Sequence, residues 1–157
     1  MFRPASCPRF LSTATLLIVT TVTIVGCRSG GSETLTRDAF LEQGNAICAK
    51  GNAEIAAAIA QDGSGGPPSG AAGEALFKSV MDASRRMIDE VGALKPPPDL
   101  QPEMTGIVSD SRIVLADLES KGAEAMFASE EDPFAEINKR LTAIGLTVCG
   151  EDPGSPK

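Results

Sequence analysis

The sequence predicts an all-α fold, an antiparallel four-helix bundle that is closed by one disulfide. Three observations lead to this prediction. Apolar residues recur at helical spacing in four separate stretches, and no stretch has the alternating pattern of a half-buried strand. Two cysteines, Cys48 and Cys149, lie near the two ends of this helical region, which we place at 36–150. Four amphipathic helices without strands pack most simply as a bundle, and a bond between the cysteines would close it.

The first 26 residues have the features of an export signal. Arg3 and Arg9 precede an apolar run from Leu11 to Val25, and the small residue Gly26 follows this run. A charged start, an apolar stretch and a small residue at the cleavage site are typical of a secretory signal peptide. The apolar run is shorter than the ~20 residues of a membrane-spanning helix. We therefore expect the segment 1–26 to be removed.

The residues at the end of this segment, Ile24-Val25-Gly26-Cys27, resemble the lipobox of bacterial lipoprotein signals. The resemblance implies that the Cys27 thiol receives a diacylglyceryl group, that cleavage precedes Cys27, and that the new amino group can be acylated, for example by palmitate. Two or three acyl chains hold a protein stably at a membrane. This predicts a lipid-anchored protein on the extracytoplasmic face of the cell membrane, with 27–35 as a lipidated flexible tether. The alternative is an uncleaved anchor in which Cys27 has no role.

Composition excludes several classes of function. The net charge of −7 becomes −9 when Arg3 and Arg9 leave with the signal, so Lys and Arg are too few to suggest binding to nucleic acid. The chain has no His, Trp or Tyr, and it therefore lacks the usual general base, the commonest metal ligand and most aromatic platforms. It also contains neither Gly-x-Ser-x-Gly nor Ser-x-x-Lys. We predict that the protein is not an enzyme, and we nominate no catalytic residue, metal site or cofactor.

The four cysteines reduce to one pair. Cys7 leaves with the signal and Cys27 is modified, so Cys48 and Cys149 remain. Outside the cytoplasm, free thiols pair as disulfides. We predict a structural Cys48–Cys149 bond, because the alternative of a redox-active pair lacks the close Cys-x-x-Cys spacing.

The first two helices are expected at 36–61 and 74–94. Thr36 is a suitable N-cap for the first, with Asp38 in the first turn. The segment 62–73 is rich in Gly, Pro and Ser and predicts a flexible loop. In the second helix one apolar stripe runs the full length, composed of Phe77, Val80, Met81, Ser84, Met87, Ile88, Val91 and Leu94.

Pro96, Pro97 and Pro98 end the second helix, and Asp99 is the expected cap of a third. The third helix is predicted to reach about residue 120 and to be interrupted at Gly122 before the segment 123–128. The predicted cap of the last helix is Ser129 or Asp132. If Asp132 is the cap, Pro133 takes the first helical position. The expected end of this helix is Cys149-Gly150. The tail 151–157 should be disordered.

A repeat in the first helix gives the main candidate for a binding site. Gly44-Asn45-Ala46 recurs as Gly51-Asn52-Ala53, and this spacing places Asn45, Cys48 and Asn52 along one stripe. Two amides beside a disulfide could line a polar pocket. In the alternative interpretation, the glycines allow close approach of a neighbouring segment, and the amides pair with backbone groups.

Three further features have a functional and a structural interpretation each. Four methionines could bind Cu(I), although without His they are more typical of an adaptable core. The acidic run 130–132 could bind calcium, but it lacks the pattern of a calcium loop and suits a helix start. The run 96–98 could bind a partner groove as polyproline or form a rigid corner. The methionines are Met81, Met87, Met104 and Met126.

Together these motifs resemble small exported lipoproteins of actinobacteria. The lipobox, Phe40 with Asn45-Ala46-Ile47-Cys48, Leu94-Lys95-Pro96-Pro97-Pro98 and Leu146-Thr147-Val148-Cys149-Gly150 follow one another in the order typical of that group. The resemblance covers nearly the whole chain after Cys27. It implies a helical domain with one disulfide and a location in the cell envelope, and it implies no activity.

Two functions remain as hypotheses. We favour a non-enzymatic accessory lipoprotein that docks on another envelope protein. The alternative is a bundle that binds a small apolar or amphipathic ligand between its helices, near Asn45, Asn52 and the methionines. An exposed apolar patch would favour docking, and an enclosed cavity would favour the ligand.

Overall fold

The computed structural model describes residues 34–62, 69–129 and 131–151. The segment 1–26, Cys27, most of the tether, the middle of the Gly/Pro-rich segment and nearly all of the tail lie outside the described residues. The described residues form helices and no strand, which confirms the all-α prediction. The helices are α1 (Arg37–Asp62), α2 (Gly70–Ala93), α3 (Gln101–Ala128) and α4 (Ala135–Ile144).

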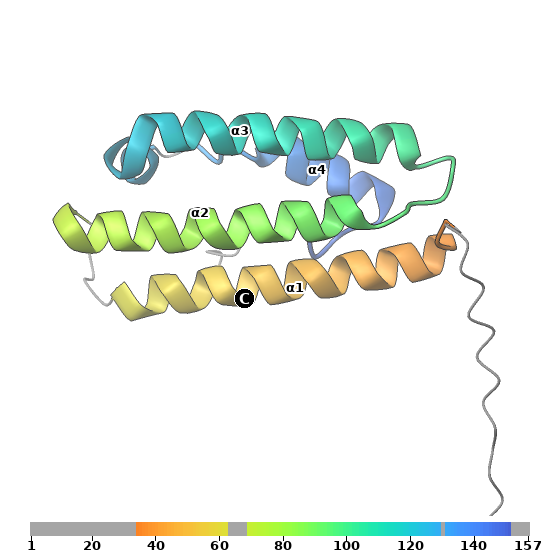
Figure 1. The fold of residues 1–157 in the computed structure, drawn as a ribbon, viewed down its shortest axis with the longest axis horizontal. Coiled ribbons are helices and arrows are strands. Elements are labelled where there is room, and N and C mark those ends of the chain that lie inside the picture. The colour runs from red at the N-terminus through yellow and green to blue at the C-terminus, as the bar shows by residue number, and fades with distance from the viewer. Residues whose placement is uncertain (1–33, 63–68, 130, 152–157) are drawn as a thin grey trace, which may run out of the picture. The chain divides into compact units, whose positions relative to one another are not determined.

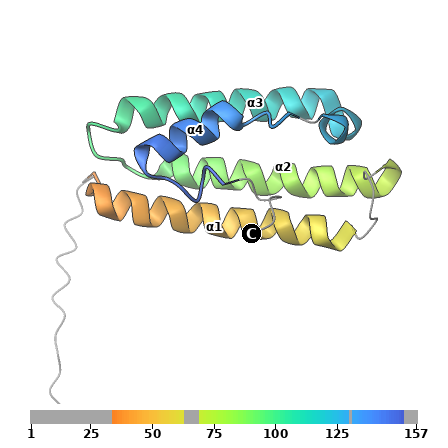
Figure 2. The same ribbon diagram turned by 180° about the vertical axis from the view of Figure 1, so that it is seen from behind.

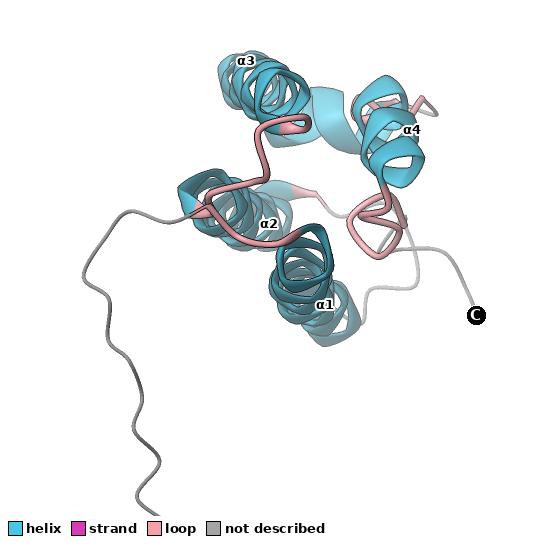
Figure 3. Ribbon diagram, turned by 90° about the vertical axis from the view of Figure 1, so that its right-hand side faces the viewer, coloured by secondary structure: helices cyan, strands magenta, loops and turns pink. Residues whose placement is uncertain are grey.

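Three long helices and one short one surround a common interior. Figures 1 and 2 show α1, α2 and α3 side by side and the short α4 next to α3. In the end-on view of Figure 3, α2 lies between α1 and α3, and the turn that follows α4 reaches back to α1. Close backbone contacts join α1 to α2, α2 to α3, and α3 to α4. No close backbone contact joins α4 to α1. The turn that follows α4, here called the closing turn, makes the connection to α1 instead.

The start of α1 agrees with the prediction. The Thr36 hydroxyl accepts a hydrogen bond from the Ala39 amide at 3.3 Å, as an N-cap does. The Arg37 guanidinium forms an ion pair with Asp99 at 3.1 Å and donates to the Ile144 carbonyl. These contacts fix the first turn of α1 against the corner before α3 and the end of α4.

The start of α2 differs from the prediction, because the helix begins at Gly70 instead of residue 74. Ser69 has an extended backbone, and its carbonyl accepts a hydrogen bond from the Gly73 amide, which closes the first turn. Gly73 and Leu76 are buried, so this turn lies on the core. Tertiary packing therefore outweighs the weak helix propensity of the glycines.

The predicted proline corner is present, but Asp99 does not cap α3. The N-cap position belongs to Leu100, and the amides of Leu100 and Gln101 both donate to the Pro97 carbonyl. Leu100 is buried, whereas Asp99 faces outward towards Arg37. The predicted interruption at Gly122 is confirmed, since its φ of 80° lies outside the helical region.

The last helix is shorter than predicted. A turn at Asp132 precedes it, in which the Asp132 carboxylate accepts from the Phe134 amide at 2.8 Å, so Pro133 lies in this turn and not in the helix. The helix ends at Ile144, before the predicted end at Cys149-Gly150, because Gly145 adopts the left-handed conformation that closes a helix. The chain then turns and buries Leu146 completely.

We predict that Gly145→Ala destabilises the protein more than Gly122→Ala does. Both glycines have positive φ, at 102° and 80°, a region that costs an L-residue about 1–2 kcal/mol. A Cβ at Gly145 would also lie 3.1 Å from a methyl group of Leu41, whereas one at Gly122 would meet nothing within 4 Å. Urea denaturation of both variants tests this difference, and equal losses would contradict it.

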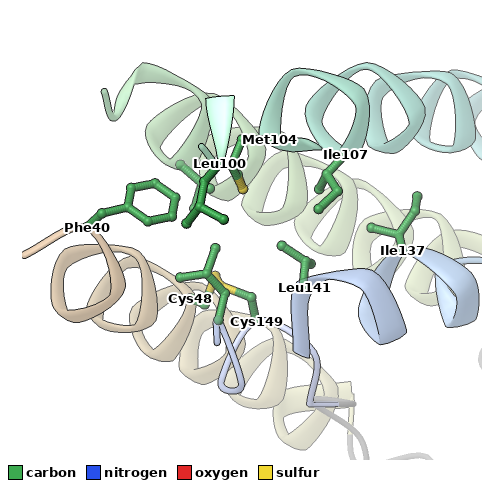
Figure 4. Packing of buried hydrophobic residues seen from close by; sticks show 10 residues of the cluster. Phe40, Cys48, Leu100, Met104, Ile107, Ile137, Leu141 and Cys149 are labelled. Atoms are coloured by element: carbon green, nitrogen blue, oxygen red, sulfur yellow. A yellow bond between two sulfur atoms is a disulfide. The ribbon is translucent and has the colours of Figure 1, made fainter. Parts of the chain in front are cut away.

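The buried apolar residues form two clusters. The first core cluster gathers around the disulfide and the proline corner, as Figure 4 shows. The second core cluster lies towards the other end of α2 and α3. The first contains Phe40, Cys48, Val91, Leu100, Met104, Ile107, Ile137, Leu141, Leu146 and Cys149, and the second Ile55, Leu76, Val80, Met81, Ala83, Leu115 and Leu118.

All of this structure belongs to one compact unit. Contacts group residues Ser32–Lys157 together, and both core clusters and the disulfide lie within that range. A chain that starts at Ser32 therefore contains every interaction of the described fold.

Candidate functional site

An apolar cavity of about 270 Å³ lies among the four helices and opens to solvent on one side, where its wall includes exposed residues such as Ile59 and Asp132. Its wall takes residues from both core clusters. Aliphatic, aromatic and sulfur-containing side chains make up most of this wall: Cys48, Ile55, Ile59, Val80, Met81, Met87, Ile88, Val91, Ile107, Val108, Leu118, Met126, Phe127, Pro133, Phe134, Ile137, Leu141 and Cys149.

The length of α4 explains why a cavity forms. At 1.5 Å per residue, the 10 residues of α4 span about 15 Å, whereas the 28 residues of α3 span about 42 Å. The side of the fold that α4 occupies is therefore helical over only part of the length of α3. Met126, Phe127 and Phe134, which lie beyond the bend at Gly122, cover some of the remaining length and line the cavity. Side chains reaching across this wider space do not fill it.

Six polar residues also line the cavity: Asn52, Ser84, Ser111, Asp132, Asn138 and Glu151. Asn52 donates to the Val148 carbonyl at 3.0 Å, and Ser111 donates to the Ile107 carbonyl at 2.8 Å. Asn138 donates to the Asp132 carboxylate at 3.1 Å. The wall is therefore mostly apolar and contains a few polar groups, as is typical of a small-molecule binding site.

The structure separates the two asparagines of the helical repeat. Asn52 lies in the cavity wall, whereas Asn45 is not among the lining residues. Asn45 accepts from the Val148 amide at 3.0 Å and donates to the Gly145 carbonyl at 3.3 Å. Both amides thus hold the turn after α4 against α1, as the structural interpretation of the repeat predicts.

The two glycines of the repeat allow close packing. A Cβ at Gly44 would lie 2.5 Å from Leu146 Cδ2, and a Cβ at Gly51 would lie 2.7 Å from the Met87 sulfur. Both glycines are buried. Their small size lets the closing turn and α2 approach α1, which brings Met87 to the cavity.

The predicted disulfide is present and forms part of the cavity wall. Cys48 and Cys149 are joined across 101 residues, with their Cα atoms 4.9 Å apart. Both cysteines are buried and both line the cavity. The bond attaches the closing turn to α1, and it therefore fixes one side of the cavity.

The methionines, the prolines and the acidic run that the sequence singled out lie in different parts of the fold. Met81, Met87 and Met126 line the cavity, whereas Met104 belongs to the first core cluster only. Pro96 and Pro97 are buried in the corner between α2 and α3. Of the acidic run, Glu130 lies outside the described residues, Glu131 is exposed and Asp132 holds the turn before α4. Within the described ranges no three potential ligands of the His, Cys, Asp and Glu types gather around a common point.

Ion pairs on the outside hold α4 against α3. The Arg140 guanidinium contacts Glu103 at 2.8 Å and Asp110 at 2.6 Å. Its hydrogen bonds, first with Glu103 and then with Asp110, raise the pKa of Arg140 above its ordinary value. Ile137 and Leu141, on the same helix, are thereby positioned in the cavity wall.

Comparison with protein-family models, with curated protein sequences and with solved structures finds no match to this chain. In the part of the chain that the structure describes, none of the helices is both long and apolar enough to cross a bilayer.

Sequence reasoning missed four of the polar cavity residues as site residues: Ser84, Ser111, Asn138 and Glu151. Ser84 and Ser111 each occupy a position in an apolar stripe, and both are buried. A small hydroxyl within such a stripe was the available signal, because it leaves space where a larger side chain would fill the core.

Proposed function

We propose that this protein is a lipid-anchored protein of the extracytoplasmic membrane face that binds a small apolar or amphipathic molecule in its cavity. The observation that carries the proposal is the apolar cavity of about 270 Å³, whose wall includes residues of both core clusters. Small-molecule sites are typically concave and mostly apolar, with a few polar groups in the wall. An apolar cavity of about 150 Å³ already binds benzene, so this one has room for a larger molecule.

The alternative, a protein-docking function, has less support from the surface. Among the described residues only two large apolar side chains are exposed, Ile59 at 45% and Ile113 at 64%. Docking surfaces usually present a contiguous apolar patch. We therefore place ligand binding first and docking on an envelope protein second.

The anchor and the bundle topology belong to the same proposal. The lipobox that ends at Cys27 supports lipidation, and the motif order supports kinship with small exported lipoproteins of actinobacteria. Short connections between consecutive long helices support an antiparallel up-down-up-down order, with α4 as a shortened fourth member. An anchor of this kind would keep the cavity close to a membrane, and apolar molecules could pass from that membrane into the cavity.

Filling the cavity should abolish binding. We expect Ser111→Phe to reduce the affinity for the uncharged fluorescent probe N-phenyl-1-naphthylamine by more than about tenfold. The added phenyl ring occupies space that the probe would fill, and the probe then loses ~1.5–3 kcal/mol of binding free energy from apolar burial. The measurement is a fluorescence titration of the chain Ser32–Lys157.

The matched control is Ile113→Phe, which adds the same ring two residues further along α3 on its exposed side. This variant should bind the probe as the unmodified chain does. Saturable binding that Ser111→Phe leaves unchanged would contradict the proposal, as would the absence of binding to the unmodified chain.

A further inference from the structure

We propose that the ligand of this cavity is an uncharged single-chain amphiphile whose polar group forms a hydrogen bond with the Ser84 hydroxyl. The inference rests on the proposed function and specifies its ligand class. Three properties of the wall lead to it: the kind of charge it carries, the way in which that charge is already paired, and one hydroxyl without a partner.

The first property argues against an anionic ligand. Among the described residues that line the cavity none is Lys or Arg, and only Asp132 and Glu151 are charged. A buried carboxylate or phosphate requires a cation or several donors to replace its water. Here it would meet two acidic side chains in a protein of net charge −7. A fatty acid anion or a phosphate ester is therefore disfavoured.

The second property argues against a cationic ligand. Both oxygens of the Asp132 carboxylate already accept hydrogen bonds, Oδ1 from the Phe134 amide at 2.8 Å and Oδ2 from the Asn138 amide group at 3.1 Å. Asp132 is itself exposed, and Glu151 is exposed too, so both carboxylates remain in contact with water. A cation inside the apolar part of the cavity would lose its hydration without reaching a buried counter-charge.

The third property identifies where a polar group would bind. Ser84 is only 7% exposed and lines the cavity. Ser79 and Ser111 donate to the carbonyl four residues earlier in their helices, but the Ser84 hydroxyl has no hydrogen-bond partner among the described residues. Its oxygen is also not sealed in, because no fully enclosed side-chain oxygen or nitrogen of the described residues lacks a partner. The hydroxyl is therefore available from the cavity.

The volume of the cavity suits a ligand with one chain. A volume of about 270 Å³ exceeds the cavity that takes benzene but lies just below the ~300–1,000 Å³ of typical ligand pockets. It suits one medium-length alkyl chain with a compact polar end, such as an alcohol or a short monoacylglycerol, whereas a two-chain lipid would extend beyond it.

The experiment compares ligands that share a chain and differ in charge. Native mass spectrometry and competition with N-phenyl-1-naphthylamine give the affinities of the chain Ser32–Lys157 for 1-decanol, decanoate and decyltrimethylammonium, with toluene as an apolar reference. We expect 1-decanol to bind about tenfold or more tightly than either ion, since a desolvated charge without a partner costs several times a neutral hydrogen bond.

Ser84→Ala tests the hydrogen bond. We expect the affinity for 1-decanol to fall about two- to tenfold, the equivalent of one neutral hydrogen bond, while the affinity for toluene stays the same. Ser79→Ala, on the exposed side of α2, should change neither affinity. The thermal unfolding temperature of each variant establishes that the fold is retained.

The outcomes separate this inference from the proposed function. If decanoate or decyltrimethylammonium binds as tightly as 1-decanol, or if Ser84→Ala changes the affinities for 1-decanol and toluene equally, the inference is wrong and ligand binding stands. If neither toluene nor the fluorescent probe binds, both are wrong.

Discussion

Replacing Cys48 and Cys149 together by alanine should lower the free energy of unfolding by about 3–5 kcal/mol. The bond closes a loop with a sequence separation of 101, and the loss of chain entropy in the unfolded state predicts about 4.7 kcal/mol for a loop near that length. The bond also holds the closing turn, which carries Leu146 and the partners of Asn45 and Asn52. Guanidinium denaturation of the variant and the oxidised chain measures the difference.

The unmodified chain with its disulfide reduced serves as the control, because it should unfold at nearly the same denaturant concentration as the double alanine variant. A loss below about 1 kcal/mol would show that the bond does not close the fold. We also expect weaker binding of the fluorescent probe, since both cysteines line the cavity.

Phe40→Ala should cost about 3–5 kcal/mol, the range for removing a buried phenyl ring. Phe40 is 0% exposed and packs in the first core cluster, where Figure 4 shows it next to Leu100 and Met104. The proline corner and the end of α4 lie at this end of the fold, and Arg37 holds both to α1, so the site cannot easily collapse.

The neighbouring Leu41→Ala is the matched control, because Leu41 is only half-buried and should cost less. Urea denaturation measures both variants. Phe40 does not line the cavity, so Phe40→Ala should leave the affinity for the fluorescent probe unchanged at temperatures where the variant is folded. Equal stability losses for the two variants would contradict this description of the core.

The helical fold could be predicted because each stretch carries an apolar stripe and a local stop signal. Thr36 as a cap, the prolines after α2 and the bend at Gly122 are local features, and the structure contains all three. The Cys48–Cys149 bond could be predicted by elimination once Cys7 and Cys27 were assigned to the export signal.

The predicted ends of helices failed where tertiary contacts decide them. Gly70 starts α2 because Gly73 and Leu76 bury its first turn, and Leu100 takes the cap position of α3 because Asp99 pairs with Arg37. The apolar residues of the last stretch continue beyond Ile144, but they form a turn that buries Leu146. None of these partners is near in sequence, so a local pattern could not reveal them.

The candidate site was only partly predictable. The sequence suggested a ligand near Asn45, Asn52 and the methionines, and the structure places Asn52 and three of the four methionines in the cavity wall. The existence of the cavity depends on the length of α4 relative to α3 and on how the segment after Gly122 covers the gap. Spacing along one helix contains no information about that mismatch.

The most direct test of the central claim is native mass spectrometry of the chain Ser32–Lys157, purified with its disulfide intact from a bacterial host that exports it. We predict a single added mass that corresponds to one small uncharged amphiphile, retained in Ile113→Phe and lost in Ser111→Phe. The claim is contradicted if all three proteins show only the mass of the protein itself, even after addition of 1-decanol and toluene. That mass is two hydrogens below the mass of the reduced chain because of the disulfide.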